Sequence, residues 1–385
     1  MATRAIDSAL SDGIHHRLSG WRGLFDAHFI GAWDDLAAHA VEPNAFLESW
    51  FLRPALEQFD VSSRAQIFAL WDGDLLCGLL PFDQQQNYGR WPFPHVQNWL
   101  HHNAFLGTPL VRAGYEASFW RALLAHFDFA PGQALFAHFA GLTVDGALAA
   151  ALAQVSASQN RRCALVHQCE RAFLGKGLSP DAYLEAAVRG KKRKELRRQR
   201  SRLSEAGALT FARDHSATGL GEWTDEFLAL EQRGWKGQNG SALACADATR
   251  TLFAEVLAGA AAAGKLERLD LRLDGKPLAM LVNFLCAPGS FSFKTAFDED
   301  YARFSPGVLL QIENLALLEH SDIAWCDSCA VEGHPMIDSL WTGRRAVGRY
   351  SVAIGGSGRR AIFGALLKAE LARSAPVPIN KGDSA

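Results

Sequence analysis

Several features that would place a protein in a special class are missing from this chain of 385 residues. The N-terminus lacks the basic start, apolar run and small-residue cleavage site of a secretory signal, and no apolar run reaches the ~18 residues of a membrane span. A net charge of −2 argues against a general nucleic-acid binder. We therefore expect a cytoplasmic protein without a transmembrane segment, and leave open a peripheral contact at the inner face of the membrane.

Cysteine and glycine are present, but not in patterns that indicate a metal or nucleotide site. The seven cysteines are odd in number and scattered, which favours reduced thiols over a disulfide framework. Cys326 and Cys329 have the spacing of a redox or metal pair without a second pair; we expect no metal, and zinc with His334 is the alternative. The Gly355-Gly356-Ser357-Gly358 cluster lacks a phosphate-loop lysine, so it predicts a turn.

One α/β unit occurs twice along the chain. A strand, an Asp-Gly turn and a second strand are predicted over residues 65–80 and again over 269–284. Each hairpin is followed by a predicted strand, over residues 104–111 in the first copy and 290–297 in the second, and then by a helix and a further strand. We therefore expect an N-terminal domain over residues 1–170, a C-terminal domain over 171–373 and a disordered tail over 374–385.

The stretch from Ser290 to Cys329 is the most informative part of the second unit. Residues 290–297 alternate between small or polar and aromatic side chains, which predicts a strand. A helix is predicted from Pro306, with Ser305 as its N-cap. Unpaired amide groups at a helix start suit a phosphate. The sequence therefore predicts an anion cradle made of Ser305, Pro306, Gly307, Val308 and Leu309.

A basic segment precedes this stretch. Nine of the fourteen residues from Arg189 to Arg202 are basic, and Leu196 and Leu203 offer one apolar seam. This pattern is typical of a solvated helix face, and equally of a rim that attracts phosphate from a donor nucleotide, a lipid headgroup, a nucleotide-sugar or tRNA.

Several motifs follow one another in order between residues 171 and 350. They are the basic segment near Lys192, Gly234-Trp235-Lys236-Gly237, Lys294-Thr295-Ala296-Phe297-Asp298 with Tyr301, Ser305-Pro306-Gly307, Asp327, and His334-Pro335-Met336-Ile337-Asp338 with Trp341. This ordered set resembles the C-terminal half of the GNAT acyltransferases of the CelD/BioF2-like group. That group is related in fold to the Fem-type peptidoglycan aminoacyl transferases.

The resemblance implies an α/β (α+β) fold of two tandem GNAT-like domains, each a mixed, mostly antiparallel sheet flanked by helices. It also implies acyl-CoA as donor, with the backbone of Thr295, Ala296 and Phe297 beside the thioester, where two parallel strands part in GNAT folds. The first copy has Arg112-Ala113-Gly114-Tyr115 in place of the Ser-Pro-Gly element. We therefore expect only the second copy to bind the donor.

Acyl transfer to an amine needs a base, because free alkyl amines are mostly protonated at neutral pH. Our candidates, in order, are Asp327, Asp298 and His334, and we expect the two carboxylates to lie close enough to raise one pKa. Lys294 is expected to pair with one of them or to hold the donor. The predicted substrate-binding residues are Trp235, Lys236, Arg193 and Arg197.

These residues favour an N-acyltransferase in which a primary amine attacks acyl-CoA directly in a ternary complex. The expected acceptor is envelope-related, either an amino sugar or the amine of a lipid or long-chain-base precursor, with no nucleic acid involved. One alternative is an aminoacyl-tRNA-dependent, Fem-like transferase that uses the basic segment. Another is a non-catalytic protein that binds an anionic glycan or lipid, in which the two strands would not part.

Overall fold

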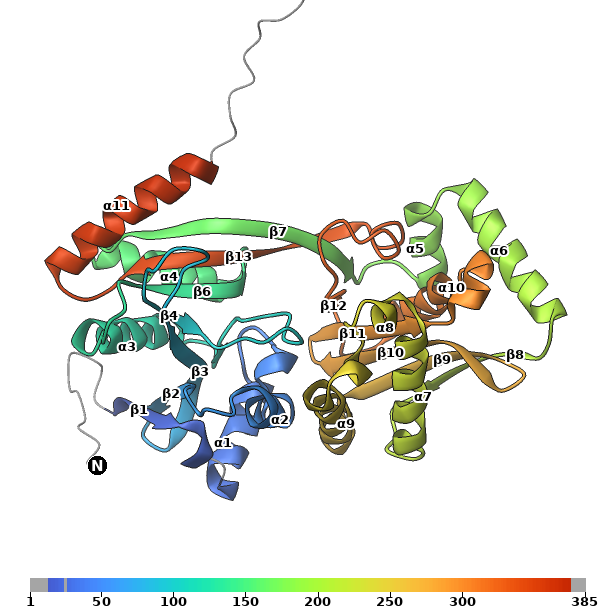
Figure 1. Ribbon diagram of the computed structural model, residues 1–385, viewed down its shortest axis with the longest axis horizontal. Coiled ribbons are helices and arrows are strands. Elements are labelled where there is room, and N and C mark those ends of the chain that lie inside the picture. The colour runs from blue at the N-terminus through green and yellow to red at the C-terminus, as the bar shows by residue number, and fades with distance from the viewer. Residues whose placement is uncertain (1–12, 24–25, 375–385) are drawn as a thin grey trace, which may run out of the picture.

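The computed structural model describes residues 13–23 and 26–374, and shows two lobes built on one continuous sheet (Figure 1). The tail predicted as disordered lies outside the described residues from 375 onward. None of the helices within 13–23 and 26–374 combines the length and apolar character needed to cross a bilayer.

The N-terminal lobe contains the first half of the chain and the last two elements. Its elements are β1 (Ile14–Gly20), η1 (Trp21–Gly23), α1 (Ala27–Ala38), η2 (Ala45–Leu47), α2 (Ser49–Phe59), β2 (Gln66–Asp72), β3 (Leu75–Gln85), β4 (His95–Asn98), β5 (Leu110–Val111), α3 (Glu116–Phe129), β6 (Phe136–Thr143), α4 (Ala147–Ser158), β13 (Gly343–Ala353) and α11 (Ser357–Ser374).

The C-terminal lobe contains the elements between these, and β7 (Cys163–Gly175) runs through both lobes. Its own elements are α5 (Pro180–Ala187), α6 (Gly190–Glu205), β8 (Leu209–Asp214), α7 (Leu220–Arg233), α8 (Trp235–Gln238), η3 (Leu243–Cys245), α9 (Asp247–Ala262), β9 (Leu266–Leu273), β10 (Lys276–Cys286), β11 (Gly289–Phe297), η4 (Glu299–Phe304), α10 (Pro306–Glu313), η5 (Asn314–Glu319) and β12 (Trp325–Asp327).

The strands form one mixed sheet in the order β1-β2-β3-β4-β6-β13-β7-β12-β11-β10-β9-β8, with β5 beside β3. Only β4–β6 and β11–β12 are parallel pairs; the other pairs are antiparallel. Each parallel pair follows a hairpin, β2–β3 or β9–β10, and encloses one α-helix, α3 or α10. This confirms the predicted fold class and the duplicated unit. The strand predicted near 104–111 is misplaced, because β4 lies earlier, at His95–Asn98.

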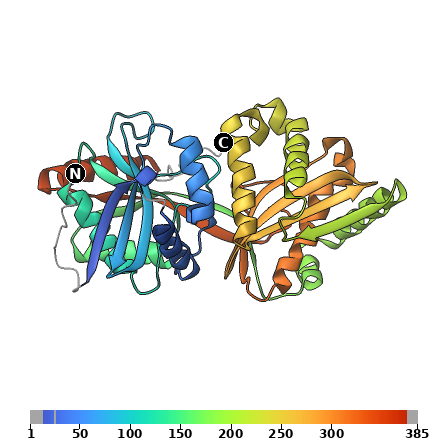
Figure 2. The ribbon, with the colours of Figure 1, turned by 90° about the horizontal axis from the view of Figure 1, so that it is seen from below.

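The long strands β7 and β13 connect the lobes (Figure 2). β13 pairs with β6 of the N-terminal lobe and along most of β7, from Gly343↔Phe173 to Val352↔Cys163. The last strand and helix of the chain therefore return to the N-terminal lobe. The division at residue 170 stays a prediction, and it falls within β7.

Helices cover both faces of the C-terminal sheet. Met280, Val282 and Phe284 of β10 pack with α7 and α9, whereas the alternate residues Ala279 and Leu281 pack with α6 and α10. This period of two is what a strand buried on both faces requires. The Asp274-Gly275 turn of the β9–β10 hairpin has positive φ at both residues, as a tight two-residue turn demands.

Candidate active site

The parallel strands β11 and β12 part soon after they begin. They pair at Gly289↔Trp325, Ser290↔Cys326 and Phe291↔Asp327, and the ladder ends there. β11 continues to Phe297 with β10 on its other side. In the described chain, the edge of β11 that faces away from β10 therefore has no strand partner from Ser292 onward, which leaves backbone groups available to a ligand.

Lys294 lies on this unpaired part of β11 and points toward the N-terminal lobe. Its ammonium donates a hydrogen bond to Asn103 Oδ1 at 2.8 Å and lies 5.1 Å and 5.4 Å from the ring centroids of Phe105 and Phe293. Burial, and to a lesser degree the charge of Lys236, lowers the pKa of Lys294 to about 8. The predicted pairing of Lys294 with Asp298 or Asp327 is wrong, because both carboxylates bind other cations.

Lys236 and Trp235 stand beside the same strand. Lys236 Nζ lies 2.7 Å from Glu231 Oε1 and 3.5 Å from the carbonyl oxygen of Thr295. Glu231 is buried and also accepts a hydrogen bond from the amide of Leu243. Trp235 is 52% exposed. These groups line a small recess of about 30 Å³ with Thr295, Ala296 and Phe297, so the structure brings Lys236 and Trp235 to the predicted donor strand.

The start of α10 is more covered than the sequence predicts. Pro306 and Gly307 are buried, and a Cβ added to Gly307 would meet the sulfur of Met336 at 3.1 Å and the ring of Phe297 at 3.3 Å. Leu309 packs in the core, whereas Ser305 and Val308 remain half-buried. The predicted cradle therefore lies next to the unpaired end of β11, with Met336 over its first turn.

The predicted N-cap hydrogen bond of Ser305 is absent. Ser305 occupies the N-cap position with φ 53° and ψ 50°, and its side chain accepts no hydrogen bond from the helix. Residues that cap through their side chain have extended backbone angles, whereas this residue is left-handed. Ser305 therefore shapes the turn into α10 without capping it.

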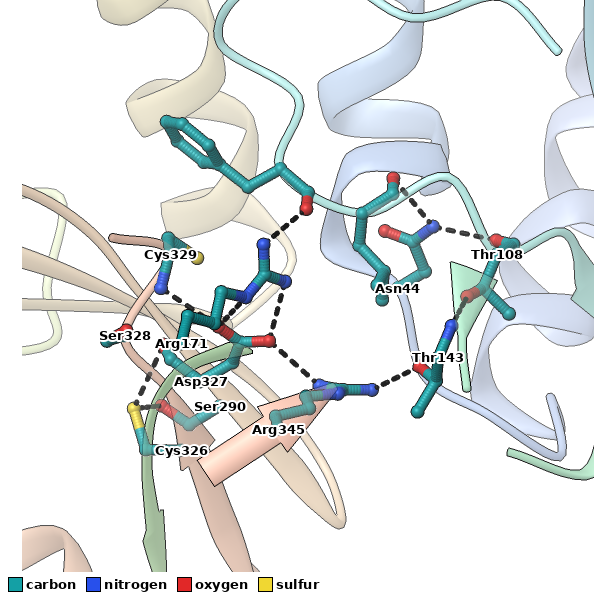
Figure 3. A network of polar contacts seen from close by, with 12 residues as sticks. Asn44, Thr108, Thr143, Arg171, Ser290, Cys326, Asp327, Ser328, Cys329 and Arg345 are labelled. Atoms are coloured by element: carbon teal, nitrogen blue, oxygen red, sulfur yellow. Dashed lines mark hydrogen bonds and ion pairs between the residues drawn. The ribbon is translucent and has the colours of Figure 1, made fainter. Parts of the chain in front are cut away.

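Asp327, the first candidate base, is sealed inside an ion-pair network (Figure 3). It is fully buried and lies 2.7 Å from Nε and Nη2 of Arg171 and 3.0 Å from Nη1 of Arg345. It also accepts the amide N–H of Cys329. Both carboxylate oxygens are thus engaged by charged donors, which leaves no free position for a substrate amine. The geometry argues against Asp327 as the base and gives it a structural role.

The same network connects the lobes. Arg171 donates to the carbonyl oxygen of Phe105 at 2.7 Å, and Arg345 donates to Thr143 Oγ1 at 2.8 Å (Figure 3). Both acceptors belong to the N-terminal lobe. Asp327 therefore holds together β7, β12 and β13 at the junction of the lobes.

Asp298 does not lie beside Asp327. It stands seven residues beyond Phe291, the register partner of Asp327, so at about 3.3 Å per residue the two are roughly 20 Å apart. Its side chain pairs with Lys276 at 2.8 Å and accepts the amide N–H of Asp300. The predicted coupling of the two carboxylates is wrong, and Asp298 caps the loop after β11.

His334 lies in the segment that also carries Met336. Its side chain is half-buried, and its Nδ1 atom is buried without a hydrogen-bond partner. Among the three predicted bases, His334 alone has a polar side-chain atom that is not engaged by a neighbouring residue of the described chain. Its role stays a prediction.

Arg193 and Arg197 lie away from Lys294 and Lys236. They are on α6, which packs with α10 on the opposite face of the sheet from α7. Arg193 pairs with Glu185 at 3.2 Å, and Arg197 is exposed. The structure therefore does not bring these two arginines together with Trp235 and Lys236.

The thiols of Cys326 and Cys329 are buried, and burial raises the pKa of each. A thiol in this environment is a poor nucleophile. Among residues 13–23 and 26–374 there is no group of three histidine, cysteine or acidic side chains that could hold a metal ion.

Four residues of the site were missed from the sequence: Asn103, Arg171, Glu231 and Arg345. Glu231 had a usable signal, because it follows Phe227 by four residues and so lies on the buried face of its helix. The other three are positioned only by contacts between distant parts of the chain.

Comparisons with known proteins found matches to a family model and to solved structures. Residues 190–330, most of the second lobe, match the family model described as acetyltransferase (GNAT) domain. No curated protein matches the chain. The structure resembles that of FemX with a TM-score of 0.54 and 10% identity, over 88% of this chain and 98% of FemX. At this identity the likeness shows a common fold, which confirms the expected relation in fold to Fem-type proteins.

Two further solved structures are similar. The C-terminal domain of a putative lysylphosphatidylglycerol synthetase from Agrobacterium fabrum aligns with 15% identity and a TM-score of 0.46, over 89% of this chain and 96% of that one. A tandem GNAT protein from the clavulanic acid biosynthesis pathway aligns with 14% identity and a TM-score of 0.44, over 89% and 99% of the two chains.

Proposed function

We propose that this chain is an N-acyltransferase of the CelD/BioF2-like group that transfers an acyl group from acyl-CoA to a primary amine. The acceptor amine attacks the thioester directly in a ternary complex, without an acyl-enzyme. The early end of the β11–β12 ladder carries this proposal, because it leaves unpaired backbone at the edge of β11 next to the start of α10. The thioester arm would lie along this edge, with its carbonyl facing the amide groups near Thr295 to Phe297.

Lys294 is the group best suited to move the proton. The amine nitrogen attacks the carbonyl carbon, a C–N bond forms and the C–S bond breaks, and one proton must pass from nitrogen to the leaving thiolate. With a pKa of about 8, Lys294 can accept the proton as a neutral amine and return it to a thiolate, whose thiol has a pKa of about 8.5. Asn103 holds its ammonium in place.

Lys236 and Glu231 support the same strand. The buried Glu231 orients Lys236, whose ammonium lies near the Thr295 carbonyl oxygen. Its charge also helps to lower the pKa of Lys294. We assign Lys236 to substrate binding with the exposed Trp235, and keep His334 as a second candidate for proton transfer because its Nδ1 is unengaged.

The acceptor we propose is an amino sugar or the amine of a lipid or long-chain-base precursor. A second candidate function is aminoacyl-tRNA-dependent transfer, favoured by the eight basic residues of α6. The alternative of a non-catalytic glycan- or lipid-binding protein predicts that the two parallel strands stay paired along their length. β11 and β12 instead pair at only three positions.

Thermal unfolding with acyl-CoAs of increasing chain length tests the proposal. At one hundred times its dissociation constant, a donor that binds only the folded chain stabilises it by about 2.7 kcal/mol. Gly307→Val should abolish this stabilisation, because the added side chain meets Met336 and Phe297 at the helix start. Gly358→Val, where an added Cβ meets nothing within 4 Å, is the matched control. Indifference to every CoA thioester, with stabilisation by aminoacyl-tRNA, would transfer the assignment to the second candidate.

A further inference from the structure

Helix α6 concentrates positive charge on one outer surface of the C-terminal lobe. It carries eight basic and two acidic residues, a net +6, whereas the whole chain sums to −2, so the remainder carries −8. Only Leu196 and Leu203 of this helix are buried. Lys194 and Arg198 are exposed, four residues apart, and neither has an ion pair within the described part of the chain.

A groove of about 520 Å³ runs between α5, α6 and the outer face of α10. Its lining combines apolar side chains, among them Leu184, Phe211 and Ile312, with arginines of α6. Two of these arginines pair with carboxylates of the groove, Arg193 with Glu185 and Arg200 with Glu313, so their charges are locally balanced. The third arginine of the lining, Arg197, forms no ion pair with another described residue, and Asp181 is a third carboxylate, so the lining as a whole is balanced. The surplus of positive charge comes from the other basic residues of α6. This arrangement is an apolar groove with a cationic rim.

The groove is separate from the proposed transfer site. Gln311 of α10 faces the sheet, with its Nε2 3.5 Å from Thr295 Oγ1, whereas the next residue, Ile312, lines the groove. The body of α10 therefore lies between the groove and the unpaired edge of β11. A ligand in the groove cannot present an amine to Lys294.

We propose that this groove and the exposed face of α6 bind an anionic phospholipid of a bilayer, with the phosphate on α6 and part of an acyl chain in the groove. Each basic residue near an anionic membrane contributes attraction, and the negative remainder of the chain orients α6 toward the surface. Leu178, 48% exposed and two residues before Pro180 of the groove lining, adds an apolar contact at the same face. The site docks the protein on the membrane and does not depend on the proposed reaction.

Nucleic acid suits the same surface less well. A phosphate backbone would use the cations of α6, but base stacking needs exposed aromatic rings, and the groove lining has one aromatic residue, Phe211, beside aliphatic side chains. Aliphatic walls favour a hydrocarbon chain.

Vesicle sedimentation of the full chain tests the proposal, with phosphatidylcholine vesicles compared with vesicles that also contain phosphatidylglycerol. We expect at least tenfold tighter binding to the anionic vesicles. Lys194→Glu/Arg198→Glu should remove most of this preference. Ala316→Glu, at an exposed position of the groove lining, should weaken binding at least fivefold at unchanged charge of α6.

The matched control is Arg121→Glu/Lys368→Glu, which reverses two exposed charges on the N-terminal lobe and should bind like the original chain. Equal binding to neutral and anionic vesicles would overturn the proposal. So would a loss of vesicle binding in this control as large as the loss in Lys194→Glu/Arg198→Glu. The proposal would also be overturned if bulk tRNA displaced the protein from vesicles and Ala316→Glu left vesicle binding unchanged. That result would assign α6 to nucleic acid. Loss of acyl-CoA binding in Ala316→Glu would instead assign the groove to the donor nucleotide.

Discussion

The two lobes differ at the point where their parallel strand pairs end. In the N-terminal lobe β4 and β6 pair at only two positions, Val96↔Ala137 and Gln97↔His138. The gap beyond is closed by Asn98, whose side chain donates to Ala140 and Gly107 carbonyl oxygens and accepts from the Ala140 amide. In the C-terminal lobe no such bridge is present among the described residues beyond Phe291 and Asp327.

The comparison supports the proposal that only the second copy binds the donor. The segment after Asn98 first fills its own gap, where Gly107 donates to Gly141 at 2.8 Å, a close approach that no side chain at Gly107 would allow. Between Asn98 and Gly107 it also reaches the other lobe, through Asn103 to Lys294 and the Phe105 carbonyl to Arg171. The N-terminal copy, whose gap is closed, therefore helps to position Lys294 and Arg171 beside the unpaired edge of β11.

The largest expected effect follows from replacing Lys294, which lies on β11 beyond the end of its pairing with β12. Lys294→Met should lower kcat/KM by about 10²–10⁴, the usual contribution of a proton-transfer group, while the unfolding temperature stays near that of the original chain. The control is Lys192→Met on the exposed face of α6. Steady-state release of CoA thiol measures both. Activity within fivefold of the original would remove Lys294 from the mechanism.

The pH profile sharpens the same test. Because burial lowers the pKa of Lys294 to about 8 from 10.5, the neutral amine is scarce below that pH and dominant above it. The rate should therefore rise with pH through about 8. The folded state also binds fewer protons than the unfolded state between about 8 and 10.5, so stability should rise with pH in that window. A rate that is flat across pH 7–9 would contradict the assignment.

Asp327→Ala should destabilise the junction of the lobes without touching the transfer step. It leaves the buried guanidinium groups of Arg171 and Arg345 unpaired, and loss of one partner of a buried ion pair costs about 3–5 kcal/mol. Asp214→Ala breaks the partly exposed pair with Arg268 and should cost about 0–1 kcal/mol. Denaturant unfolding measures the difference. An Asp327→Asn protein that unfolds normally and lacks activity would restore Asp327 as the base.

Opening the closed gap should cost stability and leave donor binding intact. Asn98→Ala removes three hydrogen bonds that a buried side chain makes to Gly107 and Ala140, so we expect a loss of about 2–3 kcal/mol. Asn239→Ala, at an exposed position, should stay within about 0.5 kcal/mol. A change in acyl-CoA affinity in Asn98→Ala would mean that the N-terminal copy also binds donor.

The sequence predicted the parts of this comparison that depend on local pattern. Alternation over 290–297 placed β11, apolar spacing and Pro306 placed α10, and repeated hairpins indicated two copies. The partners of the charged residues were not predictable, because Asn103 lies 191 residues from Lys294, and Arg171 lies 156 residues from Asp327. The return of β13 to the N-terminal lobe has the same cause. Such pairings depend on the folded topology.

The smallest expected effect concerns the helices that follow the two gaps. Neither α3 after Tyr115 nor α10 after Ser305 has a side-chain cap, whereas α5 is capped by Ser179, which accepts from the Ala182 amide. Ser179→Ala should therefore cost about 1 kcal/mol and Ser305→Ala less than about 0.5 kcal/mol in thermal unfolding. Equal losses would mean that Ser305 caps α10 in solution. The left-handed turn would then not be the conformation that brings α10 to the edge of β11.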